Sequence, residues 1–379
     1  MRIAIPAETD PAESRVAATP ETVKKFIGLG AEVAVETGAG ERSGVADAAY
    51  EKAGAVIAPD AASAVSGADI VLRVQRPTSS EIRGAKPGAA VIAIMDPYEY
   101  VSELQALASE GVCAFAMELM PRITRAQVMD VLSSQANIAG YRAIIEAAAA
   151  YERVIPMMTT AAGSVPPAKI FIMGVGVAGL QAIATARRTG GVVTATDVRP
   201  ATKEQVLSLG AKFIAVEDEE FKQAETAAGY AKEMSSEYQE KQRALTASHI
   251  SKQDIVVTTA LIPGRPAPVL ITADMVASMR PGSIIVDLAA ERGGNCELTQ
   301  PGETVTSENG VKIIGSVNGA GRAPATASEL YAKNLFAFAE TLIDKETHTL
   351  AIKWDDELVK ATLLTKDGAL PHPRFQAAS

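Results

Sequence analysis

The sequence has 379 residues, a length that predicts two domains, each large enough to form its own core. Its net charge of −9 argues against nucleic acid or an anionic membrane surface as the main partner. The two cysteines, Cys113 and Cys296, do not form a CxxC pair, so the sequence indicates neither disulfides nor a zinc site, and no metal site is predicted.

The first third of the chain alternates strand-like and helix-like segments. A helix is predicted over 20–29, because Thr19 suits the N-cap position and Pro20 the first helical position. The N-terminus does not have the pattern of a signal peptide, and no apolar run of about 18 residues predicts a membrane span. The alternation predicts a doubly wound α/β domain, and because no glycine fingerprint follows its strands, we expect it to bind no dinucleotide of its own. Strands are predicted over 2–5, 32–36, 70–74, 90–95 and 112–117.

Residues 121–137 are denser in hydrogen-bonding side chains than a connecting loop needs. An alanine-rich helix that ends near Ala150 follows them and is the natural bridge into a second domain. Asp130 and Ser133 are spaced for helix capping, in which they would serve as partners of the local backbone. They are also spaced to contact a ligand from one loop and one helical turn, and spacing alone leaves both interpretations open.

Residues 169–197 form a strand-helix-strand pattern with a glycine fingerprint. The strand-like run Lys169-Ile-Phe-Ile-Met173 leads into Gly174-Val-Gly-Val-Ala-Gly179, a helical pattern follows to Arg188, and a second strand-like run ends at Asp197. In a dinucleotide site the first glycine permits the turn, the second lets the backbone approach the pyrophosphate, and the third packs helix on strand. The helix N-terminus then faces the phosphates. Glycine clusters also make ordinary turns, but here strand, helix and terminal acid occur in the expected order. The predicted contacts in this loop are Gly174, Gly176, Val177 and Gly179.

The acid at the end of the second strand indicates which dinucleotide is bound. A carboxylate at Asp197 would accept hydrogen bonds from the adenosine ribose and repel a 2′-phosphate, so the sequence favours NAD over NADP. Arg199 could in principle bind a 2′-phosphate, but with Asp197 in place we expect it to be a solvated charge at the strand end. Val198 lies between them, and these three residues are predicted to line the cofactor site.

The remainder of the chain continues the alternation. The connection that precedes residue 254 is longer than the dozen or so residues of a crossover, and it is polar around Gly229 and Tyr230. Such a connection in a nucleotide-binding domain is a candidate lid, and a solvated pair of helices is the alternative. Helices are predicted over 203–208, 275–279 and 327–343, strands over 212–216, 254–259, 283–288 and 311–315, and an ordered tail to about Pro373.

Six segments carry a family resemblance. They are Met120-Pro-Arg-Ile-Thr-Arg-Ala-Gln127, Ser133-Ser-Gln-Ala-Asn-Ile-Ala-Gly-Tyr-Arg142, Thr160-Ala-Ala-Gly163, Gly229-Tyr-Ala-Lys-Glu-Met234, Thr258-Thr-Ala-Leu-Ile-Pro-Gly264 and Gly293-Gly-Asn-Cys296. In this order, and along essentially the whole chain, the sequence resembles the NAD(H)-binding subunit of the proton-translocating NAD(P) transhydrogenase family, which is related to alanine dehydrogenase. Several long matches in order are more specific than any single motif.

The resemblance implies a role for the polar segment near residue 130. Arg122, Gln127, Asp130 and Ser133 would form the loop that binds the nicotinamide end of NAD(H), and Arg122, Asp130 and Ser133 would position the ring for catalysis. This favours a ligand-binding role for Asp130 and Ser133, although a capping role is compatible with it.

The resemblance also implies contacts outside the fingerprint. Tyr230 would lie at the tip of a mobile loop that closes over the cofactor, and Gly229, Gln242 and Leu261 would line the site.

The chain departs from the related alanine dehydrogenases at residues that matter for chemistry. They carry a lysine and a histidine where this sequence has Gln75 and the segment Met95-Asp-Pro-Tyr98, and here no histidine precedes His249. Oxidation of an amine or alcohol needs a general base, whereas hydride passage between two nicotinamide rings moves no proton at the reacting carbons. These residues therefore fit transhydrogenation better than amino acid oxidation. Asp287 resembles the alanine dehydrogenase acid, but we prefer a structural role at a strand end.

We therefore predict two doubly wound, parallel-sheet, Rossmann-like α/β domains around a cleft. The first comprises residues 1–125 with 325–379, and the second, which binds NAD(H), comprises residues 126–324. Because only one glycine fingerprint follows a strand, NADP(H) is expected on a partner subunit, and proton translocation is expected in membrane-spanning partners. The resemblance further implies a homodimer in the cytoplasm, held at the inner membrane through its partners. The alternatives are a soluble alanine-dehydrogenase-like enzyme and a non-catalytic NAD(H)-sensing module.

Overall fold

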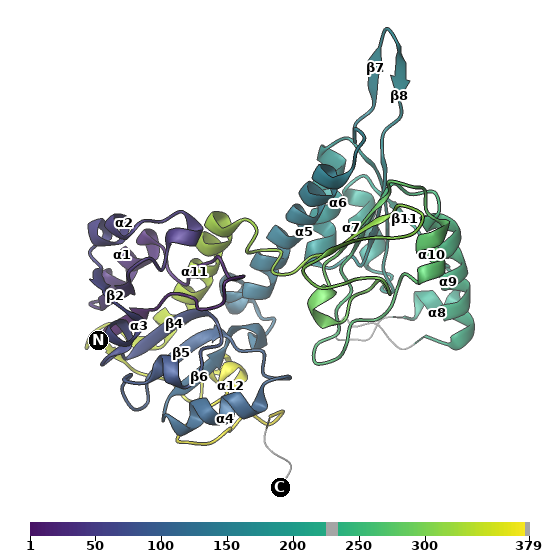
Figure 1. The fold of residues 1–379 in the computed structure, drawn as a ribbon. Helices are drawn as coiled ribbons and strands as arrows, with labels where there is room; N and C mark the ends of the chain where they lie inside the picture. Colours follow the sequence, from purple (N-terminus) through teal and green to yellow (C-terminus); the bar gives the residue numbers. More distant parts are fainter. Residues whose placement is uncertain (225–233, 376–379) are drawn as a thin grey trace. The chain divides into compact units, whose positions relative to one another are not determined.

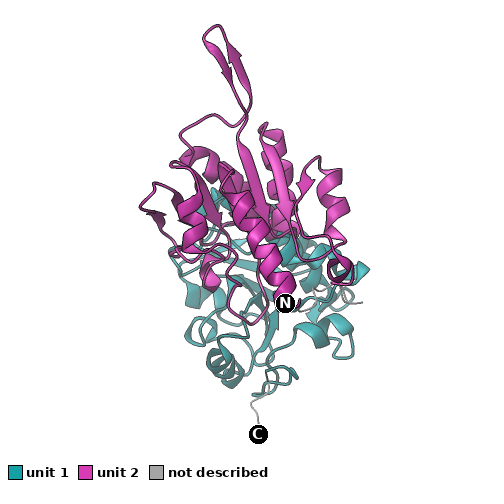
Figure 2. Cartoon of the chain, turned by 90° about the vertical axis from the view of Figure 1, so that its right-hand side faces the viewer, with its two compact units in different colours: residues 1–135, 321–379 teal, residues 136–320 magenta. Residues whose placement is uncertain are grey.

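The computed structural model describes residues 1–224 and 234–375, which divide into two compact units (Figures 1 and 2). Unit 1 comprises residues 1–135 and 321–379, and unit 2 comprises residues 136–320. Residues 126–135, which the sequence assigned to the second domain, fall in unit 1. The reason is that helix η4 (Thr124–Met129) packs against helix α11 (Pro324–Thr341), which belongs to that unit.

Unit 1 is built on a parallel sheet with the strand order β3-β2-β1-β4-β5-β6 among its described residues. Side chains alternate along each strand between the two faces of this sheet. Ile70 and Leu72 therefore join the core beneath helices α1 and α11, and Val71 joins the core beneath α4. The strands are β1 (Arg2–Ile5), β2 (Glu32–Glu36), β3 (Val56–Ala58), β4 (Ile70–Gln75), β5 (Ala90–Ile94) and β6 (Cys113–Ala116).

The helices of unit 1 begin with α1, where Thr19 forms a capping box with Thr22 and Pro20 is the first helical residue. This start was predicted from the sequence. The remaining elements include a short antiparallel pair near the C-terminus. The bounds are α1 (Pro20–Gly28), η1 (Glu41–Ser43), α2 (Asp47–Ala53), α3 (Ala61–Val65), η2 (Ser80–Ile82), α4 (Val101–Ser109), η3 (Met117–Leu119), β16 (Ile343–Asp344), β17 (Thr349–Leu350) and α12 (Glu357–Thr362).

Unit 2 has the strand order β11-β10-β9-β12-β13-β15-β14, with β14 antiparallel to β15 and the other neighbours parallel. The strands are β9 (Lys169–Met173), β10 (Val192–Thr196), β11 (Lys212–Phe213), β12 (Ile255–Thr258), β13 (Ile284–Asp287), β14 (Thr304–Thr306) and β15 (Lys312–Gly315). The helices are α5 (Val131–Ala150), which begins in unit 1, α6 (Val177–Arg188), α7 (Thr202–Ser208), α8 (Glu219–Lys222), α9 (Ser236–Ile250), α10 (Ala273–Ser278) and η5 (Ala290–Arg292).

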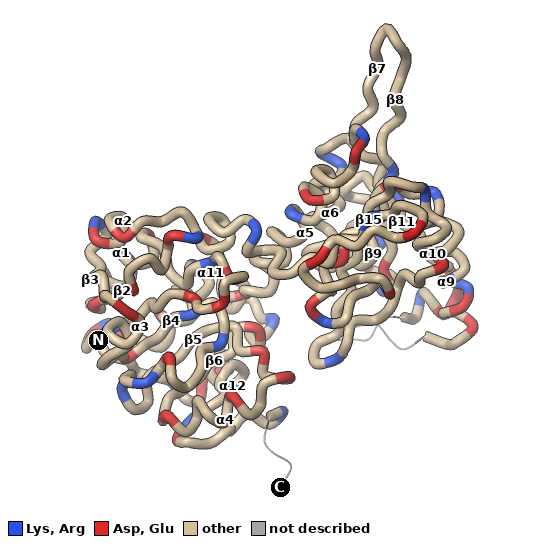
Figure 3. The backbone as a smooth tube through the Cα atoms, in the orientation of Figure 1, with Lys and Arg blue, Asp and Glu red and all other residues tan. Residues whose placement is uncertain are grey.

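The fold class predicted from the sequence is confirmed, because both sheets have the doubly wound order in which the direction of winding reverses beside the first strand. That switch point lies between β1 and β4 in unit 1 and between β9 and β12 in unit 2. Figure 3 shows acidic and basic residues interspersed along the backbone of both units.

Beyond shifts of one to three residues at other element ends, one strand is much shorter than predicted and one hairpin was not predicted. The strand predicted over 212–216 ends at Phe213, because the Val216 N–H donates to the Gln242 side chain instead of to a neighbouring strand. The sequence also did not predict the antiparallel hairpin of β7 (Met158–Thr160) and β8 (Gly163–Val165), which projects from unit 2 (Figure 1). All of its strand residues are exposed, so no buried apolar pattern marked it.

Candidate nucleotide-binding site

The glycine fingerprint lies between β9 and α6, at the switch point of unit 2. Gly174 has φ +100°, a left-handed conformation, and a Cβ there would lie 2.5 Å from the Thr259 hydroxyl oxygen. A Cβ on Gly179 would lie 1.9 Å from the Gly174 carbonyl oxygen. These two glycines are therefore required by the turn and by the packing of helix on strand.

Gly176 is different, because the protein itself does not require glycine there. Its backbone is extended (φ −81°, ψ −166°), a conformation that any residue adopts, and no described atom lies within 4 Å of a Cβ built on it. Gly176 is also the N-cap of α6, and no described side chain caps that helix. The positive end of α6 and its backbone N–H groups therefore face a space that suits a pyrophosphate.

Asp197 follows β10 and connects it to the fingerprint loop. One carboxylate oxygen accepts from the Val175 N–H at 2.8 Å, and the other accepts from the Arg199 N–H at 2.8 Å. The Arg199 guanidinium donates to both oxygens, at 2.9 and 3.0 Å. Arg199 is a partly exposed charge at the strand end, and its pairing with the carboxylate two residues before it was not predicted from the sequence. A carboxylate has about four acceptor positions, so ribose hydroxyls would have to replace some of this pairing.

Apolar side chains surround the same edge of the sheet. Val177, Val198 and Leu261 are exposed, and they follow the neighbouring strands β9, β10 and β12. Leu261 is 54% exposed and Val198 47%, which suits walls for a planar base. Gln242 lies beside them, because its side-chain amide donates to the Thr196 hydroxyl at 3.3 Å.

Sequence analysis assigned no role to Asn295, although its segment contributed to the resemblance. Its side chain is buried, accepts from the Ala260 N–H and donates to the Ala260 carbonyl, both at 2.9 Å. These bonds fix the backbone next to Leu261. The signal available in the sequence was the pair of glycines before Asn295, of which Gly294 has φ +83°.

The polar segment of unit 1 shows helix capping at Asp130 and Ser133. The carboxylate of Asp130 accepts from the Ser133 N–H at 2.8 Å and from the Ser133 hydroxyl at 2.5 Å. Arg122, on the loop before η4, and Gln127, within η4, are exposed. The structure thus brings Asp130 and Ser133 together in the capping arrangement. The predicted lid residues Gly229 and Tyr230 lie outside the described residues.

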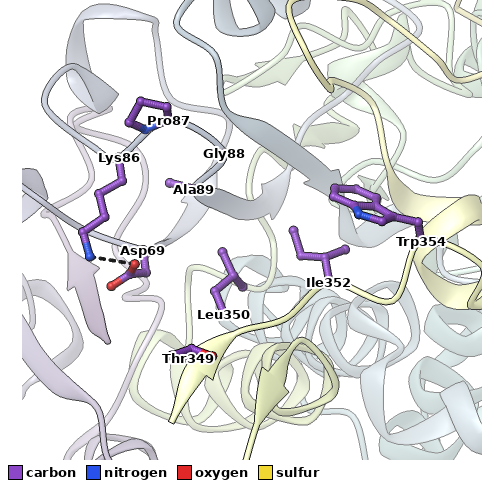
Figure 4. Close-up of a pocket in the computed structure, with 9 residues that line it drawn as sticks. All are labelled: Asp69, Lys86, Pro87, Gly88, Ala89, Thr349, Leu350, Ile352 and Trp354. Atoms are coloured by element: carbon purple, nitrogen blue, oxygen red, sulfur yellow. Dashed lines mark hydrogen bonds and ion pairs between the residues drawn. The ribbon is translucent and has the colours of Figure 1, made fainter. Parts of the chain in front are cut away.

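A hollow of about 410 Å³ lies at the amino ends of strands β4 and β5 in unit 1 (Figure 4). It is lined by Asp69 and Ala89, which directly precede β4 and β5, and by Trp354 near the C-terminus. On one side of it, Lys86 donates to Asp69 at 2.8 Å. The polar segment follows β6, at the carboxyl ends of the parallel strands. The hollow lies at their amino ends, so it does not belong to the candidate site.

Within residues 1–224 and 234–375, no cluster of three or more His, Cys, Asp or Glu side chains is arranged to hold a metal ion. No helix among those residues is long and apolar enough to span a membrane.

Comparison with known proteins identifies the family. The N-terminal domain of alanine dehydrogenase/PNT matches residues 4–139, and the C-terminal domain of alanine dehydrogenase/PNT matches residues 143–373. The chain belongs to the alanine dehydrogenase/PNT family. This confirms the resemblance that the sequence segments carried.

Relatives with two different names share this fold. The chain is 55% identical over 378 residues to an NAD(P) transhydrogenase alpha subunit of Rhodospirillum rubrum, with 98% of each chain covered. The crystal structure of transhydrogenase from Sinorhizobium meliloti is 58% identical and superposes with a TM-score of 0.89, over 98% of this chain and 100% of that one. An L-alanine dehydrogenase structure is 25% identical and has a TM-score of 0.82, over 99% and 98%. Because one fold serves both, the side chains have to distinguish the two activities.

Asp287, which in sequence resembles the alanine dehydrogenase acid, lies at the end of β13. It is 0% exposed, and its carboxylate accepts five hydrogen bonds. The donors are the Thr258 and Thr299 hydroxyls and the backbone N–H groups of Ala289, Asn295 and Cys296. A carboxylate with every acceptor position filled is suited to hold the loop that follows β13, which agrees with the preferred structural interpretation.

The sequence predicts that Gln75 and the segment Met95-Asp-Pro-Tyr98 replace the lysine and histidine of the alanine dehydrogenases. The Gln75 amide donates to the buried Glu13 carboxylate at 2.8 Å. The Asp96 N–H donates to Glu118 at 2.5 Å, and the Met95 N–H donates to the same oxygen at 2.8 Å. Burial raises the pKa of Glu118 to about 7. In this member of the family, the two positions hold no lysine or histidine, and Gln75 pairs with a neighbouring acid.

Proposed function

We propose that this chain is the NAD(H)-binding component of an NAD(P) transhydrogenase, and that hydride passes between NAD(H) on this chain and NADP(H) on a partner subunit. The observation that carries the proposal is Gly176, where neither backbone nor packing requires glycine and an uncapped helix N-terminus offers a place for a pyrophosphate. The names of the relatives support the transhydrogenase assignment.

The residues of unit 2 would bind the adenosine and pyrophosphate end of NAD(H), which supplies or accepts the hydride. Gly174, Gly176, Val177 and Gly179 would hold the pyrophosphate at α6, and Asp197, Val198 and Arg199 would hold the adenosine. Gln242 and Leu261 complete this side, and we retain Gly229 and the lid residue Tyr230 as proposed contacts. Asp197 favours NAD over NADP because its carboxylate would repel a 2′-phosphate.

Arg122, Gln127, Asp130 and Ser133 would bind the nicotinamide end. The carboxamide has one carbonyl acceptor and two N–H donors, which an arginine, a carboxylate and a hydroxyl can complement. Asp130 and Ser133 would do this while capping α5, because the cap fixes both side chains at the start of the helix. Their task would be to set the rotation of the ring.

Gln75 and Asp287, two residues at candidate positions for a general base, do not suit that role, which favours this reaction over amino acid oxidation. Amine oxidation must also move a proton. Gln75 cannot take up that proton, and Asp287 is buried and fully hydrogen-bonded. Hydride exchange between two nicotinamide rings needs positioning and exclusion of water, not a base.

The proposal includes partners. NADP(H)-binding and membrane-spanning subunits would complete the enzyme and translocate protons, and would hold this chain at the cytoplasmic face of the inner membrane. We also propose a homodimer. The β7–β8 hairpin supports a protein contact, because Met157 beside it is 68% exposed and Met158 and Val165 on it are exposed as well.

One experiment separates the proposed function from its alternatives. The chain is mixed with NADH, an NADP⁺ analogue and the NADP(H)-binding partner subunit, and reduction of the analogue is followed without any amino acid. A transhydrogenase component reduces it. An alanine-dehydrogenase-like enzyme instead forms NADH from NAD⁺ and L-alanine, and a sensing module binds NADH but does neither.

A further inference from the structure

Asn334 connects the two helical pieces that meet at Asp130. Helix η4 ends there, the Asp130 backbone is extended (φ −76°, ψ 92°), and α5 begins at the next residue. The Asn334 amide nitrogen donates to the Val128 carbonyl at 2.8 Å, on the η4 side of the break. Its amide oxygen accepts from the Ser134 hydroxyl at 2.7 Å, on the α5 side. One side chain therefore bridges the break with both its donor and its acceptor.

Asn334 acts from a well-anchored helix. Its side chain is buried, with 7% exposure, and it lies on α11 one turn beyond Tyr331. The Tyr331 hydroxyl donates to the Arg73 carbonyl on β4 at 3.0 Å. One turn earlier, the Ser328 hydroxyl accepts from the Val16 N–H at 3.0 Å. These contacts fix α11 to unit 1, so the bridging amide has a rigid support.

We propose that Asn334 is a positioning residue that sets the geometry of the nicotinamide-binding segment through Val128 and Ser134. The inference rests on the proposed function of that segment. Val128 and Ser134 flank Asp130 and Ser133 in the sequence, so the bridge fixes how η4 approaches the start of α5. Without it, Arg122 and Gln127 on the η4 side change their position relative to the Asp130 cap.

A change of this kind affects transfer more than binding. Hydride transfer requires the reacting atoms at near-attack distance and orientation, and a displacement of about 1 Å can slow a reaction on the order of a hundredfold. Binding of NAD(H) is less sensitive, because the pyrophosphate and adenosine contacts belong to unit 2 and do not involve Asn334. The bridge therefore predicts a loss of rate at nearly unchanged affinity.

A second link to the same segment differs from the bridge in burial. Arg125 donates to both oxygens of Asp356, at 2.6 and 2.9 Å, but its side chain is 46% exposed. Exposed ion pairs are screened by water and salt and contribute little. Arg125→Gln is therefore expected to change the transfer rate less than about twofold, which makes it a comparison for the buried bridge.

The test compares Asn334→Ala with Ser328→Ala, a matched control that removes a buried hydrogen-bonding group from the same helix without touching the segment. For each variant, three quantities are measured: the NADH dissociation constant by nucleotide fluorescence, the melting temperature, and the single-turnover transfer rate with the partner subunit. Asn334→Ala is expected to lower the rate at least about tenfold while the NADH dissociation constant changes less than about twofold. Ser328→Ala is expected to lower the melting temperature similarly and to transfer normally.

Ser134→Ala and the double variant Asn334→Ala/Ser134→Ala test the shared bridge. The double variant is expected to be no slower than Asn334→Ala alone, because both changes remove the same hydrogen bond. If Asn334→Ala does not fold, Ser134→Ala decides the question, with an expected slowing of about threefold or more.

Arg122→Ala distinguishes failure of this inference from failure of the proposed function. Normal transfer in Asn334→Ala together with slow transfer in Arg122→Ala would overturn the positioning role and leave the segment in the site. Normal transfer in both would remove the segment from the nicotinamide site, and the inference with it.

Discussion

The parallel strands of the two units follow the same order, but the residues at their switch points differ. In unit 2 the loop after the first strand is glycine-rich, and the following helix α6 has no side-chain cap among the described residues. In unit 1 the corresponding helix α1 is closed by the capping box of Thr19 and Thr22. The difference shows that the fold provides a position for a ligand, and that residues at the strand ends determine whether it is used.

Charged side chains fill the loop after β1 in unit 1. Glu13 accepts three hydrogen bonds from Arg15, which also donates to Gln135 at 2.9 Å. Arg73 on β4 donates to Glu8 at 3.1 and 3.3 Å. These four charged residues are almost fully buried. These acids and bases pair with one another at the switch point of unit 1. This position therefore differs from the open N-terminus of α6 in unit 2.

The largest expected effect tests the structural role of that network. Arg73→Met should lower the free energy of unfolding by about 3–5 kcal/mol, because it leaves the buried Glu8 carboxylate without its partner. NADH affinity should not change. Urea unfolding and an NADH titration measure the two quantities. Arg83→Met, which removes the exposed pair with Glu110, is the control and should change stability by less than about 1 kcal/mol. A large loss of NADH affinity in folded Arg73→Met would place the network of unit 1 in the binding site.

Gly176→Val tests the open position in unit 2. We expect NADH affinity to fall about a hundredfold, or about 2.7 kcal/mol, because the new side chain would occupy the pyrophosphate space. The melting temperature should change little, since the backbone is extended and no described atom lies near the new Cβ. Gly179→Ala should behave in the opposite way and lower stability first. Normal NADH binding by Gly176→Val would move the phosphates away from this loop.

The next largest expected effect is on the pH dependence of stability and involves Glu118. Burial raises its pKa to about 7 from an ordinary value near 4.5, so the folded protein binds a proton that the unfolded chain releases. Stability should therefore fall as pH rises from about 4.5 to about 7, and Glu118→Gln should remove that loss. We expect the variant to match the wild type near pH 4.5 and to exceed it by about 2–3 kcal/mol above pH 7. Thermal melting of both proteins across this range tests the difference. A constant difference at every pH would show that Glu118 does not carry the proton.

The repeating α/β pattern was readable because buried parallel strands are short apolar runs and helices have a 3.6-residue period. Strands β1, β2 and β9 have the bounds that the sequence predicted, and β10 ends at Thr196, one residue before the predicted end at Asp197. The hairpin β7–β8 was missed because exposed strands lack an apolar pattern, and β11 ended early because a distant side chain, Gln242, takes the Val216 N–H. Contacts between residues far apart in the sequence are not visible in local patterns.

The same limit applies to the candidate site. Spacing within one segment predicted the glycine turn and offered the cap at Asp130 as one of two interpretations, because both depend on residues a few positions apart. Spacing did not predict the bridge from Asn334, which lies 200 residues from Ser134. It also did not predict the pairing of Arg199 with Asp197, because the sequence does not show whether a strand-end arginine turns back onto the acid two residues before it.

Arg199 and Asp197 form a charged pair beside the unit 2 fingerprint. Unlike the buried pairs of unit 1, this pair is partly exposed. Asp197→Ala should weaken NADH binding by about 1–3 kcal/mol, because that is the scale of lost charge-assisted hydrogen bonds. The same change frees the Arg199 guanidinium from its carboxylate partner, so affinity for NADPH should rise toward that for NADH. The double variant Asp197→Ala/Arg199→Ala should lose NADH affinity to a similar extent but gain no affinity for NADPH, because the Arg199 cation is absent.

Isothermal titration of both nucleotides against the wild type and the two variants separates charge repulsion by Asp197 from attraction by Arg199. Equal NADPH affinity in the single and double variants would assign the preference to the carboxylate alone, and unchanged NADH affinity in both would show that neither residue contacts the ribose.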